Sequence, residues 1–168
     1  KILRRPREHL LRLGRNEQRE NMGATASKTK FEKAQKFFEA CASGKGWQAC
    51  QDYADVLAPF ESQGPELKDV GTVKAYAEWM KTFCATTAPN ATYELRAAAY
   101  DDVRNVAVFA GTLHATHTGE GGPVKPTKKA TGTNFAYVLF VNEKGLVHKM
   151  MKVWNSAFCF DELGWPHA

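Results

Sequence analysis

The chain has 168 residues, of which 43% are hydrophobic, and this composition favours one folded domain over a disordered chain. Its 23 basic and 18 acidic side chains give a formal net charge of +5, but the surplus lies at the N-terminus. Residues 1–21 contain seven basic and three acidic side chains, whereas the other residues contain 16 basic and 15 acidic ones. A nearly neutral body does not favour nucleic-acid binding, and the absence of a long apolar run does not favour a membrane protein.

Residues 1–30 are predicted to form a basic N-terminal tail and linker, followed by one domain over residues 31–168. Pro6 and Gly14 disfavour a helix in the Arg-rich part, and the small polar residues 22–30 are typical of a linker. Such a leader is typical of targeting to a mitochondrion or plastid, and equally of an arm that docks on a partner protein. Both interpretations remain open at this point.

The first half of the domain has the spacing of helices. A cap at Ser27 or Thr29 precedes apolar residues at intervals of three and four, and Gly44 and Gly46 then end the pattern. A second helix is predicted from Trp47 to Leu57, before Pro59. A third begins near Asp69 and ends before Pro89.

After Pro89 the hydrophobic period changes from 3.6 to 2. Strands are predicted over residues 92–100, 103–118, 131–141 and 146–158, with a hairpin turn at residues 142–145. Three helices followed by an antiparallel meander indicate an α+β domain in which the helices cover one face of the sheet.

The four cysteines do not have the spacing of a metal site or a redox pair. Cys41, Cys50, Cys84 and Cys159 are predicted to be free thiols, mostly buried, in a reducing intracellular compartment. His114 and His117 lie on opposite faces of a strand, so they are not expected to chelate one metal together. We expect neither a metal nor another cofactor.

Several short motifs follow one another in the second half of the chain: Thr116-His117-Thr118-Gly119, a Gly/Pro loop with Pro126-Thr127, Glu143-Lys144-Gly145, Lys152-Val153-Trp154-Asn155 and Leu163-Gly164-Trp165. With this order of elements, the chain resembles the SnoaL-like polyketide-cyclase branch of the nuclear transport factor 2-like superfamily. The resemblance implies a cone in which three N-terminal helices pack on a curved, mainly antiparallel sheet of four to six strands. It also implies a homodimer through the outer face of the sheet.

The resemblance also implies where the chemistry would lie. Cyclases of this branch remove a proton next to a carbonyl group, using the histidine of the first motif and a carboxylate after the tryptophan of the last strand. His117 matches the histidine, but Asn155 stands at the carboxylate position, and an amide cannot accept a proton at neutral pH. His117 would then be the acid or base, and Asn155 a polar anchor for an oxyanion.

The Asn155 face of the last strand would line the cavity, together with aromatic residues from the other elements. The predicted ligand-binding residues are Tyr53, Trp79, Tyr93, Tyr137, Met151 and Val153, and the ligand is a small hydrophobic molecule. If the cone is an enzyme, we expect an isomerase, lyase (dehydratase) or cyclase that uses no metal. The alternative is a non-catalytic subunit that docks into a larger assembly through residues 1–21.

Overall fold

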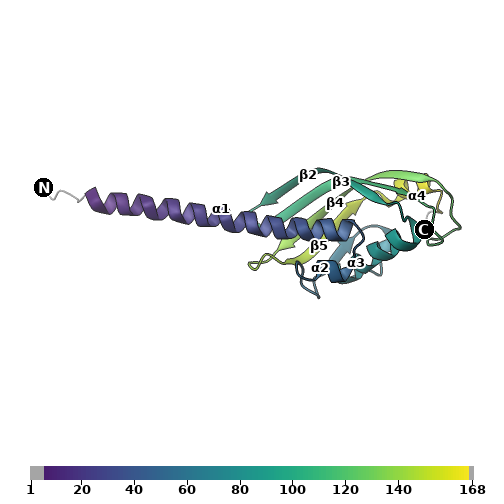
Figure 1. The fold of residues 1–168 in the computed structure, drawn as a ribbon, viewed down its shortest axis with the longest axis horizontal. Coiled ribbons are helices and arrows are strands. Elements are labelled where there is room, and N and C mark those ends of the chain that lie inside the picture. The colour runs from purple at the N-terminus through teal and green to yellow at the C-terminus, as the bar shows by residue number, and fades with distance from the viewer. Residues whose placement is uncertain (1–5, 167–168) are drawn as a thin grey trace.

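The structure is a computed structural model that describes residues 6–166, with side chains from Met22 to Pro166. It begins with α1 (Pro6–Ala42), a single helix whose N-terminal part extends beyond the rest of the molecule (Figure 1). Residues 22–30, predicted to be a linker, are helical. The expectation that Pro6 and Gly14 disfavour a helix was wrong, since α1 includes both. Pro6 is compatible with this helix because a proline in the first turn has no helical hydrogen bond to lose. The domain boundary at residue 31 stays a prediction.

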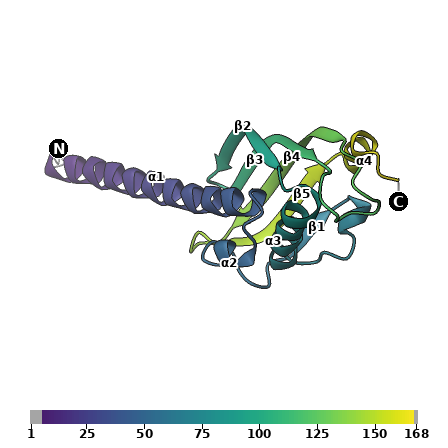
Figure 2. The same cartoon turned by 45° about the vertical axis from the view of Figure 1, so that its right-hand side comes forward.

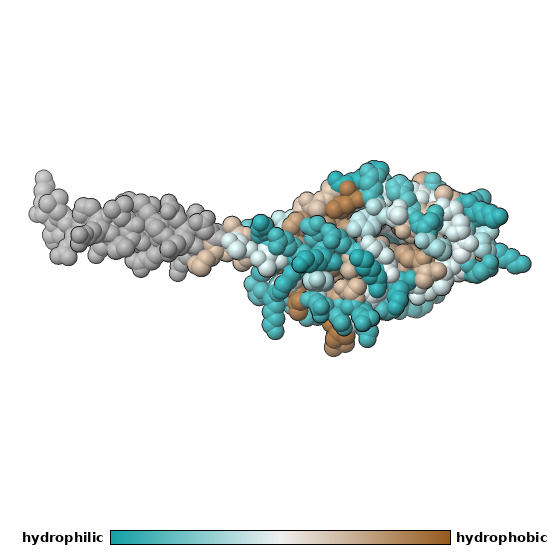
Figure 3. Space-filling model, viewed as in Figure 1, coloured by the Kyte–Doolittle hydropathy of each residue, from teal (hydrophilic) through white to brown (hydrophobic). Residues whose placement is uncertain are grey.

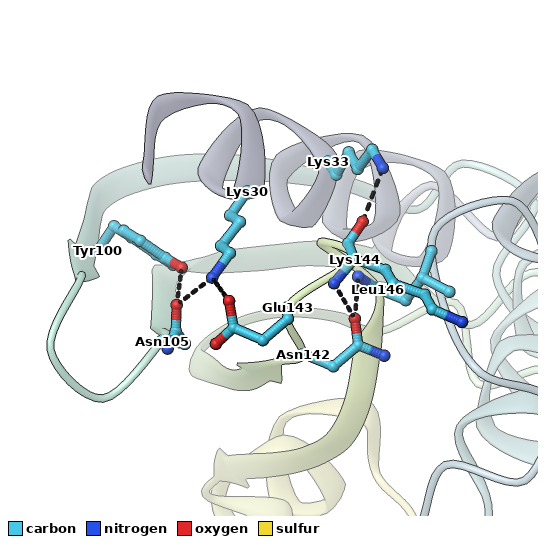
Figure 4. Close-up of polar contacts among 8 residues, drawn as sticks. All are labelled: Lys30, Lys33, Tyr100, Asn105, Asn142, Glu143, Lys144 and Leu146. Atoms are coloured by element: carbon cyan, nitrogen blue, oxygen red, sulfur yellow. Dashed lines mark hydrogen bonds and ion pairs between the residues drawn. The ribbon is translucent and has the colours of Figure 1, made fainter. Parts of the chain in front are cut away.

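Two lysines attach α1 to the turns at one end of the sheet (Figure 4). Lys30 Nζ donates to Asn105 Oδ1 at 2.9 Å and pairs with Glu143 Oε2 at 2.7 Å, while Lys33 Nζ donates to the Lys144 carbonyl at 2.8 Å. The Lys30 side chain is only 15% exposed, but Glu143 is 85% exposed, so their ion pair is a surface contact of small energy. The contacts fix the direction in which α1 leaves the domain.

The sheet has five strands in the order β1-β5-β4-β3-β2. β2 (Thr92–Asp101), β3 (Val106–Thr116), β4 (Ala130–Val141) and β5 (Val147–Trp154) form the predicted antiparallel meander. The fifth strand, β1 (Phe60–Ser62), pairs in parallel with β5 and is not among the predicted strands. Register shifts in the β2–β3 and β4–β5 pairs are irregularities that help to bend such a sheet.

The other N-terminal helices lie with α1 on one face of the sheet (Figure 2). α2 (Trp47–Cys50) is shorter than predicted, because residues 53–55 exchange backbone hydrogen bonds with Val147 of β5. α3 (Val73–Thr82) begins at the N-cap Thr72 and continues into a π-helical turn, Phe83–Thr87. A turn of 3-10 helix, Pro65–Leu67, lies between β1 and α3.

The core between the helices and the sheet is built mainly from aromatic rings. Phe38 of α1 stacks on Phe109 at 4.7 Å between ring centroids and meets Tyr137 edge-on at 5.4 Å. Phe37 and Phe38 are fully buried, as the helical spacing in the sequence predicts. The molecular face seen in Figure 3 carries mainly hydrophilic side chains with a few separate hydrophobic ones.

A further helix, α4 (Ser156–Leu163), replaces the end of the predicted last strand. Asn155 is its N-cap, and Gly164 ends it in the left-handed conformation at φ 70°. The Trp165 backbone N–H then donates to the Phe160 carbonyl at 2.8 Å, which completes a C-terminal cap. Within the described residues, no helix is both long and apolar enough to span a membrane.

Candidate functional site

A cavity lies inside the cone, between the sheet, α3 and α4, and the centre of a water molecule can occupy about 50 Å³ of it. Its wall is almost entirely apolar and aromatic, and only two of the lining side chains carry a formal charge, Glu66 and Lys152. The lining residues are Ala42, Glu66, Trp79, Met80, Phe83, Tyr93, Leu113, Phe135, Tyr137, Lys152, Trp154, Cys159, Phe160 and Trp165.

Lys152 is a buried cation in this wall. It stands between Met150 and Trp154 on the inner face of β5 and is 5% exposed. Its Nζ lies 3.9 Å from the ring centroid of Trp154, 5.3 Å from that of Tyr76 and 5.8 Å from that of Trp79. Burial lowers the pKa of Lys152 from 10.5 to about 8, although the negative charge of Glu66 acts in the opposite direction. The ring faces partly replace the hydration that the ammonium group has lost.

Glu66 supplies the carboxylate of the cavity from the 3-10 turn. Its Oε1 accepts a hydrogen bond from Trp154 Nε1 at 3.1 Å. Its Oε2 is buried and has no hydrogen-bond partner among the described residues. Burial raises the pKa of Glu66, while Lys152 and the Trp154 hydrogen bond act against the rise. No carboxylate oxygen of the described residues lies within 4.0 Å of Lys152 Nζ, so the pair is not a closed salt bridge.

The two phenols beside this pair bind one another. The hydroxyl oxygens of Tyr76 and Tyr137 are 2.7 Å apart, and both rings are fully buried. Desolvation raises the pKa of both phenols well above 10.0, so they stay neutral and act as hydrogen-bond donors or acceptors. The polar groups of the site are therefore an amine, a carboxyl group and a phenol pair in an apolar wall.

The predicted ligand-binding residues divide into two groups. Trp79, Tyr93 and Tyr137 line the cavity, whereas Tyr53, Met151 and Val153 do not. The prediction that the Asn155 face of the last strand lines the cavity was wrong, because Val153 on that face is 55% exposed on the outer side of the sheet. β5 pairs with β4 so that Lys152 stands opposite Tyr137, whose ring points inward. Both faces of this strand carry apolar residues, so alternation alone does not select the inner one.

His117, the predicted acid or base, is fully buried but does not line the cavity. The Trp165 indole N–H donates to His117 Nδ1 at 2.9 Å, and His117 Nε2 lies 2.8 Å from the Gly121 carbonyl oxygen. An indole N–H can only donate, so Nδ1 is the acceptor and Nε2 carries the proton. Both ring nitrogens thus bind protein groups. These contacts of His117 with Trp165 and Gly121, called the His117 clasp below, join the end of β3 to the C-terminal segment.

The glycine loop after His117 is bound to the π-helical turn. The backbone N–H groups of Gly119 and Gly121 donate to the carbonyls of Thr87 and Thr86 at 3.0 and 2.7 Å. A side chain at either glycine would collide with Thr86. The glycines therefore allow a close backbone approach that supports the His117 clasp.

Asn155, the predicted oxyanion anchor, caps α4 instead. Its side-chain oxygen accepts from the Phe158 backbone N–H at 3.0 Å, and the residue is exposed outside the cavity. The structure does not bring it together with His117 in one site. The sequence contains a signal for this helix, because Asn155 is a preferred N-cap residue and Gly164, nine residues later, is a preferred helix stop.

Replacing Asn155 with alanine should therefore cost about 1 kcal/mol of the free energy of unfolding, the usual value of an N-cap. Asn155→Asp should retain most of this stability, because a carboxylate accepts the same hydrogen bond. Urea unfolding of the three proteins measures the difference. Equal losses in both variants would show that the cap is not what Asn155 contributes.

Lys152 and Glu66 are the site residues that sequence reasoning missed. A single lysine between Met150 and Trp154 at alternate positions of a strand is the available signal, but its meaning depends on the strand register. Among residues 22–166, no group of three or more His, Cys, Asp or Glu side chains is placed to hold a metal ion. All four cysteines are free thiols.

The sheet, its covering helices and the cavity between them form an α+β cone, the fold of SnoaL-like and nuclear transport factor 2-like proteins. No protein-family model matches the chain, and no curated protein matches its sequence. Solved structures do match its fold.

One match is a SnoaL-like protein of Jannaschia sp. CCS1, with a TM-score of 0.68, 10% identity, and coverage of 84% of this chain and 95% of the other. A nuclear transport factor 2-like protein of Burkholderia thailandensis E264 has a TM-score of 0.60 and 13% identity, covering 82% and 98%. The pinacolase BvnE of Penicillium brevicompactum has a TM-score of 0.60 and 14% identity, covering 81% and 89%.

Proposed function

We propose that the cone binds a small, mainly apolar carbonyl compound and performs acid–base chemistry on the carbon next to the carbonyl group. The observation that carries this proposal is Lys152, a buried amine facing a cavity whose wall is almost entirely apolar. With a pKa of about 8, about a tenth of this amine is neutral at pH 7. A base near the working pH is suited to proton removal, and its conjugate ammonium can stabilise the resulting enolate.

Glu66 would be the second proton carrier, and the Tyr76–Tyr137 pair would bind oxygen atoms of the ligand. The sequence-based roles of His117 and Asn155 are not part of this proposal, because their polar atoms hold the loop and α4. The reaction class is that of an isomerase, dehydratase or cyclase. One fold can carry many unrelated functions, so the proposal depends on the cavity residues and not on the fold.

The test combines ligand binding with proton exchange. Acetophenone, an aromatic ketone, should bind, and the protein should accelerate deuterium exchange of its methyl group, followed by NMR in deuterated water. Lys152→Met should remove the acceleration. Leu113→Phe should weaken binding by filling the cavity, whereas Val153→Phe, on the outer face of the same sheet, should not. Unchanged binding and exchange in Leu113→Phe would overturn the proposal.

We also propose that two copies pair through the outer face of the sheet, which the N-terminal helices leave uncovered (Figure 2). This face presents partly exposed apolar side chains from three strands: Val106, Val108, Ala136, Val138, Met151 and Val153. An apolar patch of this kind suits a two-fold contact between identical chains. Light scattering would give the mass in solution, and a monomer at micromolar concentration would contradict the pairing.

The second candidate function is a non-catalytic subunit that docks through its basic N-terminal part. It is favoured by the extension of α1 beyond the cone (Figure 1), since residues 1–21 hold most of the surplus positive charge. Cross-linking in the native source distinguishes the candidates, because docking predicts links from residues 1–21 to another chain. Localisation in a reducing compartment, or in a mitochondrion or plastid, stays a prediction.

A further inference from the structure

We propose that the Lys152 amine forms an imine with the aldehyde or ketone carbon of the bound ligand. This inference rests on the proposed function and deepens it, since it names the substrate class and a covalent step. An amine that only moves protons and an amine that binds carbon differ in their products, so the two roles can be separated by experiment.

The geometry favours a nucleophile over a structural cation. A structural lysine in a protein interior normally meets carboxylates or carbonyl oxygens, because a buried charge is costly without partners. Lys152 makes no hydrogen bond or ion pair among the described residues, and aromatic faces surround its amine. Nothing polar therefore has to be displaced before the amine reaches a ligand in the cavity.

The groups that face Lys152 from the neighbouring elements do not hold it in the charged form. Glu66 of the 3-10 turn, Cys41 of α1 and Cys159 of α4 raise its pKa, but desolvation is the larger effect and leaves it at about 8. Tyr76 of α3 and Tyr137 of β4 are neutral. Compared with an ordinary lysine at pH 7, the neutral fraction is about 300-fold larger. Desolvated lysines of this kind are the ones that form Schiff bases.

The step is balanced without an oxidant or reductant. The nitrogen lone pair attacks the carbonyl carbon, the C=O electrons move to oxygen, and one proton passes from nitrogen to that oxygen. The carbon–oxygen bond of this carbinolamine then breaks as the second nitrogen proton leaves with the oxygen as water, and the C=N bond forms. The buried, unpartnered Oε2 of Glu66 is suited to carry these protons, and the residue returns to its starting state.

With the Lys152 nitrogen held in the imine, Glu66 takes over from Lys152 the removal of the proton from carbon. Once protonated, the C=N group withdraws electrons from the neighbouring carbon more strongly than the ketone does. Glu66 and the phenol pair could then act on that carbon. The covalent step thus leads to the same reaction class as the proposed function.

Reductive trapping tests the imine directly. The full chain is incubated at pH 7.5 with benzaldehyde and sodium cyanoborohydride, and benzylated lysines are located by peptide mass spectrometry. We expect about tenfold more label on Lys152 than on Lys74, an exposed lysine of α3. Labelling should rise with pH up to about 8 and then level off. Label on Lys152 no greater than on Lys74 would overturn the inference.

Matched variants separate a missing imine from a missing site. Lys152→Met should lose the site-specific label, and Lys74→Met should keep it. Benzyl alcohol has the same ring but cannot form an imine, so its binding, measured by native mass spectrometry, reports on the cavity alone. Binding of benzyl alcohol without trapping would overturn the imine and leave the cavity site intact. The absence of both would overturn the inference and the proposed function together.

Discussion

Replacing Lys152 with methionine is expected to raise the free energy of unfolding at pH 7 by about 1–3 kcal/mol. Folding lowers the pKa of this lysine from 10.5 to about 8, and each tenfold loss of proton affinity on folding costs about 1.4 kcal/mol. Methionine has a similar length and no charge, so it can remain among the same aromatic rings without the desolvation cost. Few substitutions in a cavity wall are expected to stabilise a protein this much.

The pH dependence of this stability difference shows whether the charge of Lys152 is its cause. Between pH 8 and 10.5 the unfolded chain binds more protons at Lys152 than the folded chain, so the stability of the parent protein rises with pH in this window. The advantage of Lys152→Met should be complete below pH 8 and disappear towards pH 10.5. Urea unfolding from pH 6 to pH 10 measures it, with Lys74→Met as the control for an exposed lysine. A constant difference across this range would mean that packing, not charge, distinguishes the variant.

Replacing His117 with alanine should lower the free energy of unfolding by about 2–4 kcal/mol. The substitution leaves a buried space and removes the acceptor for Trp165 and the donor for the Gly121 carbonyl. Trp165→Phe, which removes the indole donor and keeps a ring, should cost about 1–2 kcal/mol. Urea unfolding of the two variants gives both values.

His114→Ala is the matched control, since His114 lies three residues earlier on β3 and is exposed. Its effect should stay within about 0.5 kcal/mol. If His117→Ala were as mild as His114→Ala, the clasp would not be structural, and a catalytic role for His117 would regain support. Binding of benzyl alcohol should survive in His117→Ala wherever the protein is folded.

The sequence predicts the class of fold well because periodicity and turn chemistry agree over most of the chain. The helical spacing of apolar residues before Gly44, the antiparallel strands and the hairpin turn at residues 142–145 are confirmed. The motifs around His117 predict the correct architecture, because the clasp with Trp165 depends on them. These motif residues around His117 stabilise the fold and do not line the cavity, so they predict the architecture but not the ligand site.

The wrong predictions for α2, β1 and the inner face of β5 have one physical cause: contacts between segments that are far apart in the sequence. α2 is short because Val147 competes for the backbone of residues 53–55, and β1 exists only because β5 offers its edge. The inner face of β5 is set by its register with Tyr137 of β4. A buried lysine is invisible to residue patterns, since the same alternation with Lys152 outward would be an ordinary half-exposed strand.

The length of α1 has a mechanical consequence. At about 1.5 Å per residue its 37 residues form a rod of about 55 Å. Lys30 and Lys33 hold this rod to the turns of the sheet at one point along its length. Ala42, in its last turn, is part of the cavity wall. A force applied at the N-terminal end would therefore reach the ligand site as a small displacement of that wall, because close-packed interiors transmit strain. The N-terminal part of α1 and the wall of the cavity are thus parts of one continuous helix.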